Sequence, residues 1–220
     1  KEAETAFGIL EKGVSHILFT GQDPVELKKT LSWVKAIAKQ VSLEVAEVID
    51  IRPAGMGDRV CVDTCTEMKA GEGMLVGNSS RVLFLVHAES IENPYVSPRP
   101  FRVNAGAVHA YTRAADGRTR YLSELASGDQ ILITDFEGNI SVGTVGRLKI
   151  ERRPLVLLRA KVGDTEASTI LQNAETIRLT DPEGRAVSVV SLKPGDKILV
   201  AVEAAGRHFG MKIDETITEK

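Results

Sequence analysis

The sequence predicts an α+β protein, with a short helix–strand–helix piece at residues 1–42 and a mainly β region at 43–220. Two observations predict this division. In residues 1–42 the apolar residues recur at helical spacing on both sides of one short apolar run. In residues 43–220 they form short runs separated by glycine turns. One motif also recurs three times in the second region, which indicates repeated small barrel-like or sandwich-like units.

The first piece combines two predicted helices with a predicted strand. Residues 1–20 contain a helix pattern that ends at Gly13 and then an apolar run typical of a short strand. Asp23 and Pro24 predict the N-cap and first position of an amphipathic helix that runs to about Gln40. These three elements alone cannot build a parallel sheet. We therefore expect them to be the C-terminal remnant of an α/β domain, the alternative being that they join the β region.

The β region carries a repeated pattern in which an apolar residue, a glycine turn, an acidic residue and an apolar run follow each other. The copies are residues 68–76, 125–133 and 192–200. One such unit cannot bury its apolar face alone, so the copies must pack together. We expect short strands throughout and three units, at roughly 43–100, 101–168 and 169–220.

The composition limits the classes of partner. The chain of 220 residues is 43% hydrophobic and 26% charged, which is ordinary for a globular protein. Its net charge of −2 gives no reason to expect a nucleic acid or an anionic membrane as partner. No apolar run approaches the roughly 18 residues of a membrane span. We predict a cytoplasmic protein that could form a homo-oligomer.

The segment from Glu89 to Tyr111 is the strongest candidate site. It concentrates charged and polar residues, and three prolines stand in its first half. Proline fixes φ and lacks an N–H donor, so this half should be neither helix nor central strand. Rigid loops are common carriers of catalytic and binding residues. Because the second and third copies have plainer connections, we predict that function was added to one edge of a repetitive scaffold.

Four residues of this neighbourhood are candidates for proton transfer. His87 closes an apolar run and His109 lies in an expected second strand, and imidazole titrates near neutral pH. Each could equally be a structural hydrogen-bonding residue. Glu89 and Glu92 suit a base, a metal ligand or the partner of an amine, unless they are simply solvated.

Five further residues are candidates for binding. Arg99 and Arg102 suit a carboxylate or phosphate because guanidinium is a planar two-pronged donor, the alternative being surface ion pairs. Asn93, Asn104 and Tyr111 can form hydrogen bonds to hydroxyl groups of a ligand, although asparagine before proline is also a common turn residue.

Two other places carry reactive groups. Arg207 and His208 lie between glycines, which allow a backbone to approach a ligand, so they are candidates for a second half of the site or else form a surface turn. Cys61 and Cys65 have no second cysteine pair, which disfavours zinc. Asp63 interrupts an apolar strand with a charge, and buried carboxylates are rarely unpaired.

Long motifs support a family resemblance. They are GMGDRVCVDTC (55–65), GEGMLVG (71–77), FLVHAES (84–90), ENPYV (92–96), RPFRVNAGAVHAY (99–111), ILQNAETIRL (170–179) and EAAGRHFGMK (203–212). Over essentially the whole chain the sequence closely resembles the archaeal-type, or type II, 3-dehydroquinate synthases. Members of that family are longer at the N-terminus, in agreement with the expected missing domain.

The resemblance implies an NAD-dependent enzyme at the entry of the shikimate route to aromatic amino acids. Such an enzyme oxidises the amine-bearing carbon of 2-amino-3,7-dideoxy-D-threo-hept-6-ulosonate, releases ammonia and closes the product by an internal aldol reaction to 3-dehydroquinate. Under this chemistry Arg99, Arg102 or Arg207 would hold the carboxylate, and His87 or His109 would take a proton.

Under the same chemistry Tyr111 is a candidate for stabilising the ketone oxygen, while Glu92, Asn93 and Asn104 would hold hydroxyls. The NAD site stays open, because the glycines at 71–77 lack the dinucleotide spacing and lead into a strand. No metal is implied.

Two other classes of function remain possible on the sequence alone. One is a non-catalytic β-repeat module for binding or assembly. The other is a divalent-metal hydrolase that uses His87, His109, Asp63 and Glu89.

Overall fold

The computed structural model describes residues 23–37, 40–94, 96–203, 207–208 and 211–212. The helix expected after Asp23 is present as α2 (Pro24–Ile37). Its cap is confirmed, because Asp23 Oδ1 accepts the Val25 N–H at 2.9 Å. The helix and strand expected within residues 1–20 lie outside the described residues.

The rest of the described chain is mainly β, which confirms the α+β class. The strands are β1 (Leu43–Thr64), β2 (Gly73–Gly77), β3 (Val82–His87), β4 (Arg102–Ala107), β5 (Tyr111–Arg113), β6 (Thr119–Tyr121), β7 (Gln130–Thr134), β8 (Ile140–Val162), β9 (Thr165–Gln172), β10 (Arg178–Thr180), β11 (Ala186–Ser188), β12 (Lys197–Val202), β13 (Arg207–His208) and β14 (Met211–Lys212). A 3-10 helix, η1, covers Leu122–Glu124. No helix in the described part of the chain is long and apolar enough to cross a membrane.

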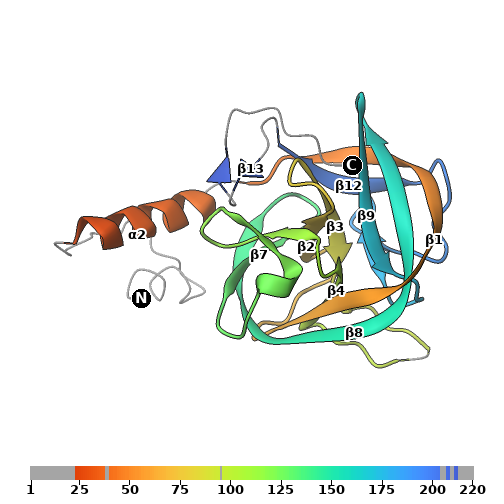
Figure 1. Cartoon of the computed structure of the whole chain (residues 1–220), viewed down its shortest axis with the longest axis horizontal. Coiled ribbons are helices and arrows are strands. Elements are labelled where there is room, and N and C mark those ends of the chain that lie inside the picture. Colours follow the sequence, from red (N-terminus) through yellow and green to blue (C-terminus); the bar gives the residue numbers. More distant parts are fainter. Residues whose placement is uncertain (1–22, 38–39, 95, 204–206, 209–210, 213–220) are drawn as a thin grey trace.

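Six strands close into an antiparallel barrel. Following the hydrogen-bonded pairs, β3 joins β12, β12 joins β1, β1 joins β8, β8 joins β7, β7 joins β2, and β2 returns to β3. Closure of this kind leaves no free edge around the ring. Strand β4 pairs with β1, and β9 pairs with β8, in addition to the six strands of the ring. Figure 1 shows β1 and β8 arching together around the molecule, with α2 to one side.

The expectation of short strands is wrong for β1 and β8, which have 22 and 23 residues. In β1 the sequence contains Pro53 and Gly55, which usually end a strand. Here the register to β8 shifts between them, and Gly55 takes a φ of +79°, so the strand bends without ending.

The repeated motif has one local structure in its three copies. Gly71, Gly128 and Gly195 have φ values of +85°, +93° and +96°, which only glycine adopts readily. In each copy the next residue is acidic, and its carboxylate accepts the N–H of the residue three positions earlier, at 2.7, 2.8 and 2.9 Å. The three copies are therefore structurally equivalent turns.

The strands after these turns share one hydrophobic core. Equivalent residues of the three copies point inward and are buried: Met74 and Val76, Ile131 and Ile133, and Ile198 and Val200. This explains why a single copy is insufficient, because each contributes only a few apolar side chains to the common interior. The proposed boundaries between the units stay a prediction.

Candidate functional site

A loop inserted between β3 and β4 carries the first half of the predicted site, and hydrogen bonds close its neck. Glu89 and Arg99 form an isolated antiparallel bridge, with the Arg99 N–H donating to the Glu89 carbonyl at 2.7 Å. The Glu89 N–H donates to the Arg102 carbonyl at 2.8 Å. Residues 90–98 are neither helix nor strand in the part described, which confirms the prediction from the prolines.

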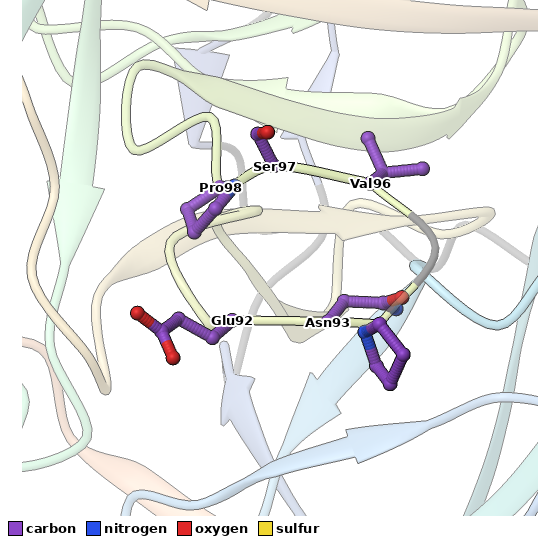
Figure 2. Close-up of a pocket in the computed structure, with 6 residues that line it drawn as sticks. Glu92, Asn93, Val96, Ser97 and Pro98 are labelled. Carbon is purple, nitrogen blue, oxygen red and sulfur yellow. The ribbon is translucent and has the colours of Figure 1, made fainter.

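The loop folds around an open hollow of about 550 Å³. Its lining residues are Glu92, Asn93, Pro94, Val96, Ser97 and Pro98. Figure 2 shows the two limbs of the loop facing each other, with Glu92 and Asn93 on one limb and Val96, Ser97 and Pro98 on the other. The hollow thus combines a carboxylate, an amide and a hydroxyl with apolar proline rings, as small-molecule sites commonly do.

At the neck of the loop, Glu89 and Arg99 form an ion pair. Arg99 Nε lies 3.0 Å from Glu89 Oε2, but the atoms are not aligned as a hydrogen bond. Glu89 is buried, while the Arg99 side chain is 32% exposed. Burial raises the pKa of Glu89 above its ordinary value, and the nearby guanidinium groups of Arg99, Arg102 and Arg59 oppose that rise.

Arg102, a second predicted anion-binding residue, is paired with a carboxylate inside the protein. Its Nε and a terminal nitrogen donate to the two carboxylate oxygens of Asp63 at 2.6 and 2.8 Å, and Arg147 donates to the same carboxylate from β8 at 2.9 Å. Burial alone would raise the pKa of Asp63, but the hydrogen bonds from both arginines outweigh it and hold that pKa below its ordinary value. Asp63 is therefore a paired, buried carboxylate.

Next to this cluster lies a second one that sequence reasoning missed. Arg59 contacts Cys61 Sγ and the Glu151 carboxylate, and Lys149 and Arg153 also pair with Glu151, each at 3.1 Å. Burial raises the pKa of the Cys61 thiol to about 11, so this cysteine is a poor nucleophile. The available signal was the alternation of charges at every second residue over 147–153, which places them on one face of a strand.

Asn104, predicted to bind substrate, lies on β4 beside these clusters and is buried. Its side-chain amide donates to Gln172 Oε1 at 2.8 Å, while its Oδ1 has no hydrogen-bond partner among the residues described. Gln172 was not expected. This pair links β4 to β9, and neither residue lines the hollow.

His87 ends β3 as expected, but both of its ring nitrogens are engaged. Nε2 accepts the Gly71 N–H at 2.8 Å, and Nδ1 lies 2.6 Å from the Ala88 carbonyl, to which it can donate. Burial lowers the pKa of His87, so the ring is neutral near pH 7. This geometry favours a structural role that fixes the first glycine turn, and the catalytic role stays a prediction.

The neck lies at the start of β4, and His109 and Tyr111 follow the end of that strand. His109 is in the turn between β4 and β5, not in a strand as expected, because the chain reverses there; it is exposed, with Nε2 3.1 Å from Asn78 Oδ1. Tyr111 stacks on Tyr121 with ring centroids 4.7 Å apart, and their hydroxyls are 3.0 Å apart. Tyr121 was missed by sequence reasoning.

The remaining predicted residues, Arg207 and His208, form β13, which pairs with β14 in a separate two-stranded sheet. Nothing further is described of their side chains. The structure thus brings together Glu89, Arg99 and the loop residues, and it separates His87 from His109.

The described residues form neither a metal-binding cluster nor a dinucleotide-binding loop. No group of three or more His, Cys, Asp or Glu side chains converges in this part of the chain. Nor does any strand described here lead through a glycine loop into a helix, which is the arrangement that binds a dinucleotide pyrophosphate. The described residues therefore do not fit the usual NAD site.

The fold and the loop define an antiparallel barrel domain with a hollow of small-molecule size. The family model described as "3-dehydroquinate synthase II C-terminal domain" matches residues 45–220. The chain belongs to this family, which confirms the resemblance found in the sequence.

Similar proteins carry consistent names. The chain is 56% identical to "3-dehydroquinate synthase" of Methanopyrus kandleri, over all of this chain and 56% of the relative. It is 54% identical to the protein of that name in Methanocaldococcus jannaschii, covering 61% of it, and 53% identical to a "3-dehydroquinate synthase homolog" of Aquifex aeolicus, covering 66%. The chain thus spans only part of their lengths. No solved structure gives a significant match.

Proposed function

We propose that this chain is the C-terminal part of a 3-dehydroquinate synthase of the second type. The observation that carries the proposal is the family match over residues 45–220, together with relatives of that name that share more than half of the residues. Because the chain spans 56% of the first of these relatives, the activity belongs to the full-length protein.

The proposed reaction converts 2-amino-3,7-dideoxy-D-threo-hept-6-ulosonate to 3-dehydroquinate in aromatic amino acid biosynthesis. The amine-bearing carbon gives its hydride to NAD⁺, water replaces the nitrogen so that ammonia leaves and a ketone forms, and an internal aldol reaction closes the ring. The substrate is a small polyhydroxy amino acid, and a hollow of about 550 Å³ is within the range of small-molecule sites. Its lining supports this class of ligand, because Glu92 can accept from an amine or hydroxyl and Asn93 can both donate and accept.

The proposed oxidant is NAD⁺. Since the described residues do not fit a dinucleotide, we assign no residue of this chain to the cofactor. What these residues can supply is binding and orientation of the substrate. A cytoplasmic location and a homo-oligomer also stay predictions.

The test is an assay of the full-length protein with the amino-heptulosonate and NAD⁺. We expect absorbance at 340 nm to rise, with one NADH and one ammonia for each 3-dehydroquinate formed. A control without the amino substrate should stay flat. If neither NADH nor 3-dehydroquinate forms, the proposal is wrong, and a non-catalytic binding module becomes the better interpretation. The metal-hydrolase alternative has no support in the described residues.

A further inference from the structure

Five charged side chains form a ladder of alternating sign that ends at the neck of the loop. In order they are Arg147, Asp63, Arg102, Glu89 and Arg99. Asp63 is shared by the two arginines beside it, and Glu89 lies close enough to Arg102 and Arg99 for both to influence its pKa. The ladder has three positive and two negative members, so it carries a net positive charge.

The two arginines nearest the loop differ in exposure and in how far their hydrogen-bond donors are already paired. The side chain of Arg102 is 9% exposed and holds both oxygens of Asp63. Arg99 is 32% exposed, and among the described residues it pairs only with Glu89, through Nε and without a well-aligned hydrogen bond. The terminal nitrogens of Arg99 therefore remain for a ligand.

Arg99 is the chain neighbour of a residue that lines the hollow, although it is not itself one of the lining residues. It directly follows Pro98, which lines the hollow. Its N–H and carbonyl are both fixed in the neck, by Glu89 at 2.7 Å and by the N–H of Arg102 at 2.9 Å. These bonds fix the backbone from which the side chain projects, and the terminal nitrogens of a guanidinium can offer a carboxylate two parallel hydrogen bonds.

We propose that Arg99 binds the carboxylate of the substrate, and that Glu89 is a positioning residue that holds Arg99 at the neck and takes no proton from the substrate. This inference deepens the proposed function and rests on it. It selects one of the three arginines that the sequence left open, and it moves Glu89 from the candidate catalytic residues to a supporting role.

The first test replaces Arg99 in the full-length protein. Loss of a charge-assisted two-pronged contact should raise KM for the amino-heptulosonate by about 30-fold or more in Arg99→Ala, with kcat within about threefold. Arg99→Lys keeps the charge and should fall in between, and it remains informative if the alanine variant folds poorly. The matched control is Arg147→Ala, at the far end of the ladder, which should keep the wild-type KM. A KM unchanged in both Arg99 variants would overturn the proposal.

The second test separates positioning from catalysis at Glu89. Glu89→Gln should raise KM by about tenfold while kcat and its pH profile stay close to wild type. Loss of a general base would instead lower the rate by at least about 100-fold, and a positioning residue causes no such loss. A fall in kcat of about 100-fold, with loss of one limb of the pH profile, would show that Glu89 transfers a proton and would overturn this part.

A binding measurement separates failure of this inference from failure of the proposed function. Calorimetric titration with 3-dehydroquinate, which carries the same carboxylate, measures binding without turnover. If the wild type produces NADH but Arg99→Ala binds 3-dehydroquinate as tightly as wild type, only this inference fails. If the wild type neither turns over nor binds 3-dehydroquinate, the proposed function fails, and this inference fails with it.

Discussion

Arg99 and Arg102 are three residues apart on one segment, yet their surroundings differ completely. Arg102 is buried against Asp63 with two aligned hydrogen bonds, and Arg99 is partly exposed with one misaligned partner. The difference separates two functions of charge. A buried charge that is hydrogen-bonded to a carboxylate holds strands together, whereas a partly exposed charge without an aligned hydrogen bond can bind a ligand.

The barrel scaffold, which contains Arg102, and the loop with its neck, which contains Arg99, show the same contrast. On the scaffold, His87 and Asp63 are buried and have partners at hydrogen-bond distance. On the loop, Glu92 and Ser97 are exposed around the hollow. We therefore expect substitutions in the scaffold to lower stability first, and substitutions in the loop and its neck to lower ligand affinity first.

The largest effect should follow from Asp63→Ala. This change leaves Arg102 buried without its carboxylate and removes the only ion-pair partner of Arg147 among the described residues. Breaking a buried pair in this way costs about 3–5 kcal/mol of unfolding free energy. Urea denaturation monitored by circular dichroism measures it.

The matched control is Asp50→Ala, on the same strand, where a half-buried carboxylate lies 3.7 Å from Arg52. It should change the unfolding free energy by less than about 0.5 kcal/mol. Similar losses for the two aspartates would remove the distinction between a structural and a peripheral charge on β1.

A smaller loss is expected for His87→Ala. The substitution removes the acceptor of the Gly71 N–H and leaves a cavity at the end of β3. Leaving a buried donor unsatisfied costs about 1–3 kcal/mol. His109→Ala, at an exposed turn, should lose less than about 0.5 kcal/mol. If His87→Ala unfolds like wild type but loses most of its kcat, the histidine belongs to the catalytic apparatus instead.

The stability should also depend on pH through His87. Burial lowers its pKa in the folded state below the ordinary 6.5, so the unfolded chain binds the proton more readily. The stability from the neutral ring is therefore fully present above about pH 6.5 and is lost as the pH falls from there toward the lowered pKa. Unfolding free energies from pH 8 to pH 5 should fall more steeply for wild type than for His87→Gln.

The titration of Glu89 changes the stability with pH in the opposite direction to that of His87, so the pH series needs a control for Glu89. Burial raises its folded pKa above 4.5, so its contribution is fully present below pH 4.5 and is lost as the pH rises through the raised value. Repeating the pH series in Glu89→Gln removes this contribution. Equal slopes for the Glu89→Gln protein with and without His87→Gln would show that His87 does not control the acid limb.

Local signals in the sequence predicted much of this fold. The Asp23 cap, the three glycine turns and the proline-rich loop are each specified by a few neighbouring residues, and the structure has all of them. The lengths of β1 and β8 were not predictable in this way. Pro53 and Gly55 normally end a strand, and only pairing with the distant β8 carries β1 past them.

The candidate site was predictable as a segment but not as a set of contacts. Sequence spacing placed Arg99 and Arg102 together and could not show which of them is engaged, because Asp63 is 39 residues from Arg102 in the chain. Likewise the partner of His87 is the Gly71 amide, 16 residues away. Pairing across strands decides such roles, and one sequence contains no record of it.

The smallest effect distinguishes the two arginines that share Asp63. Arg147 pairs with Asp63 as Arg102 does, but its side chain is 64% exposed. Exposed pairs contribute about 0.2–1 kcal/mol, so Arg147→Ala should lower the unfolding free energy by less than about 1 kcal/mol. In the Arg102→Ala background Asp63 has only Arg147 left, and the same substitution should then cost more than in the wild type. A double-mutant cycle measures this difference as a coupling energy. If the losses of unfolding free energy were strictly additive, the two arginines would bind Asp63 independently. The larger loss on removing Arg102 would then follow from its burial alone.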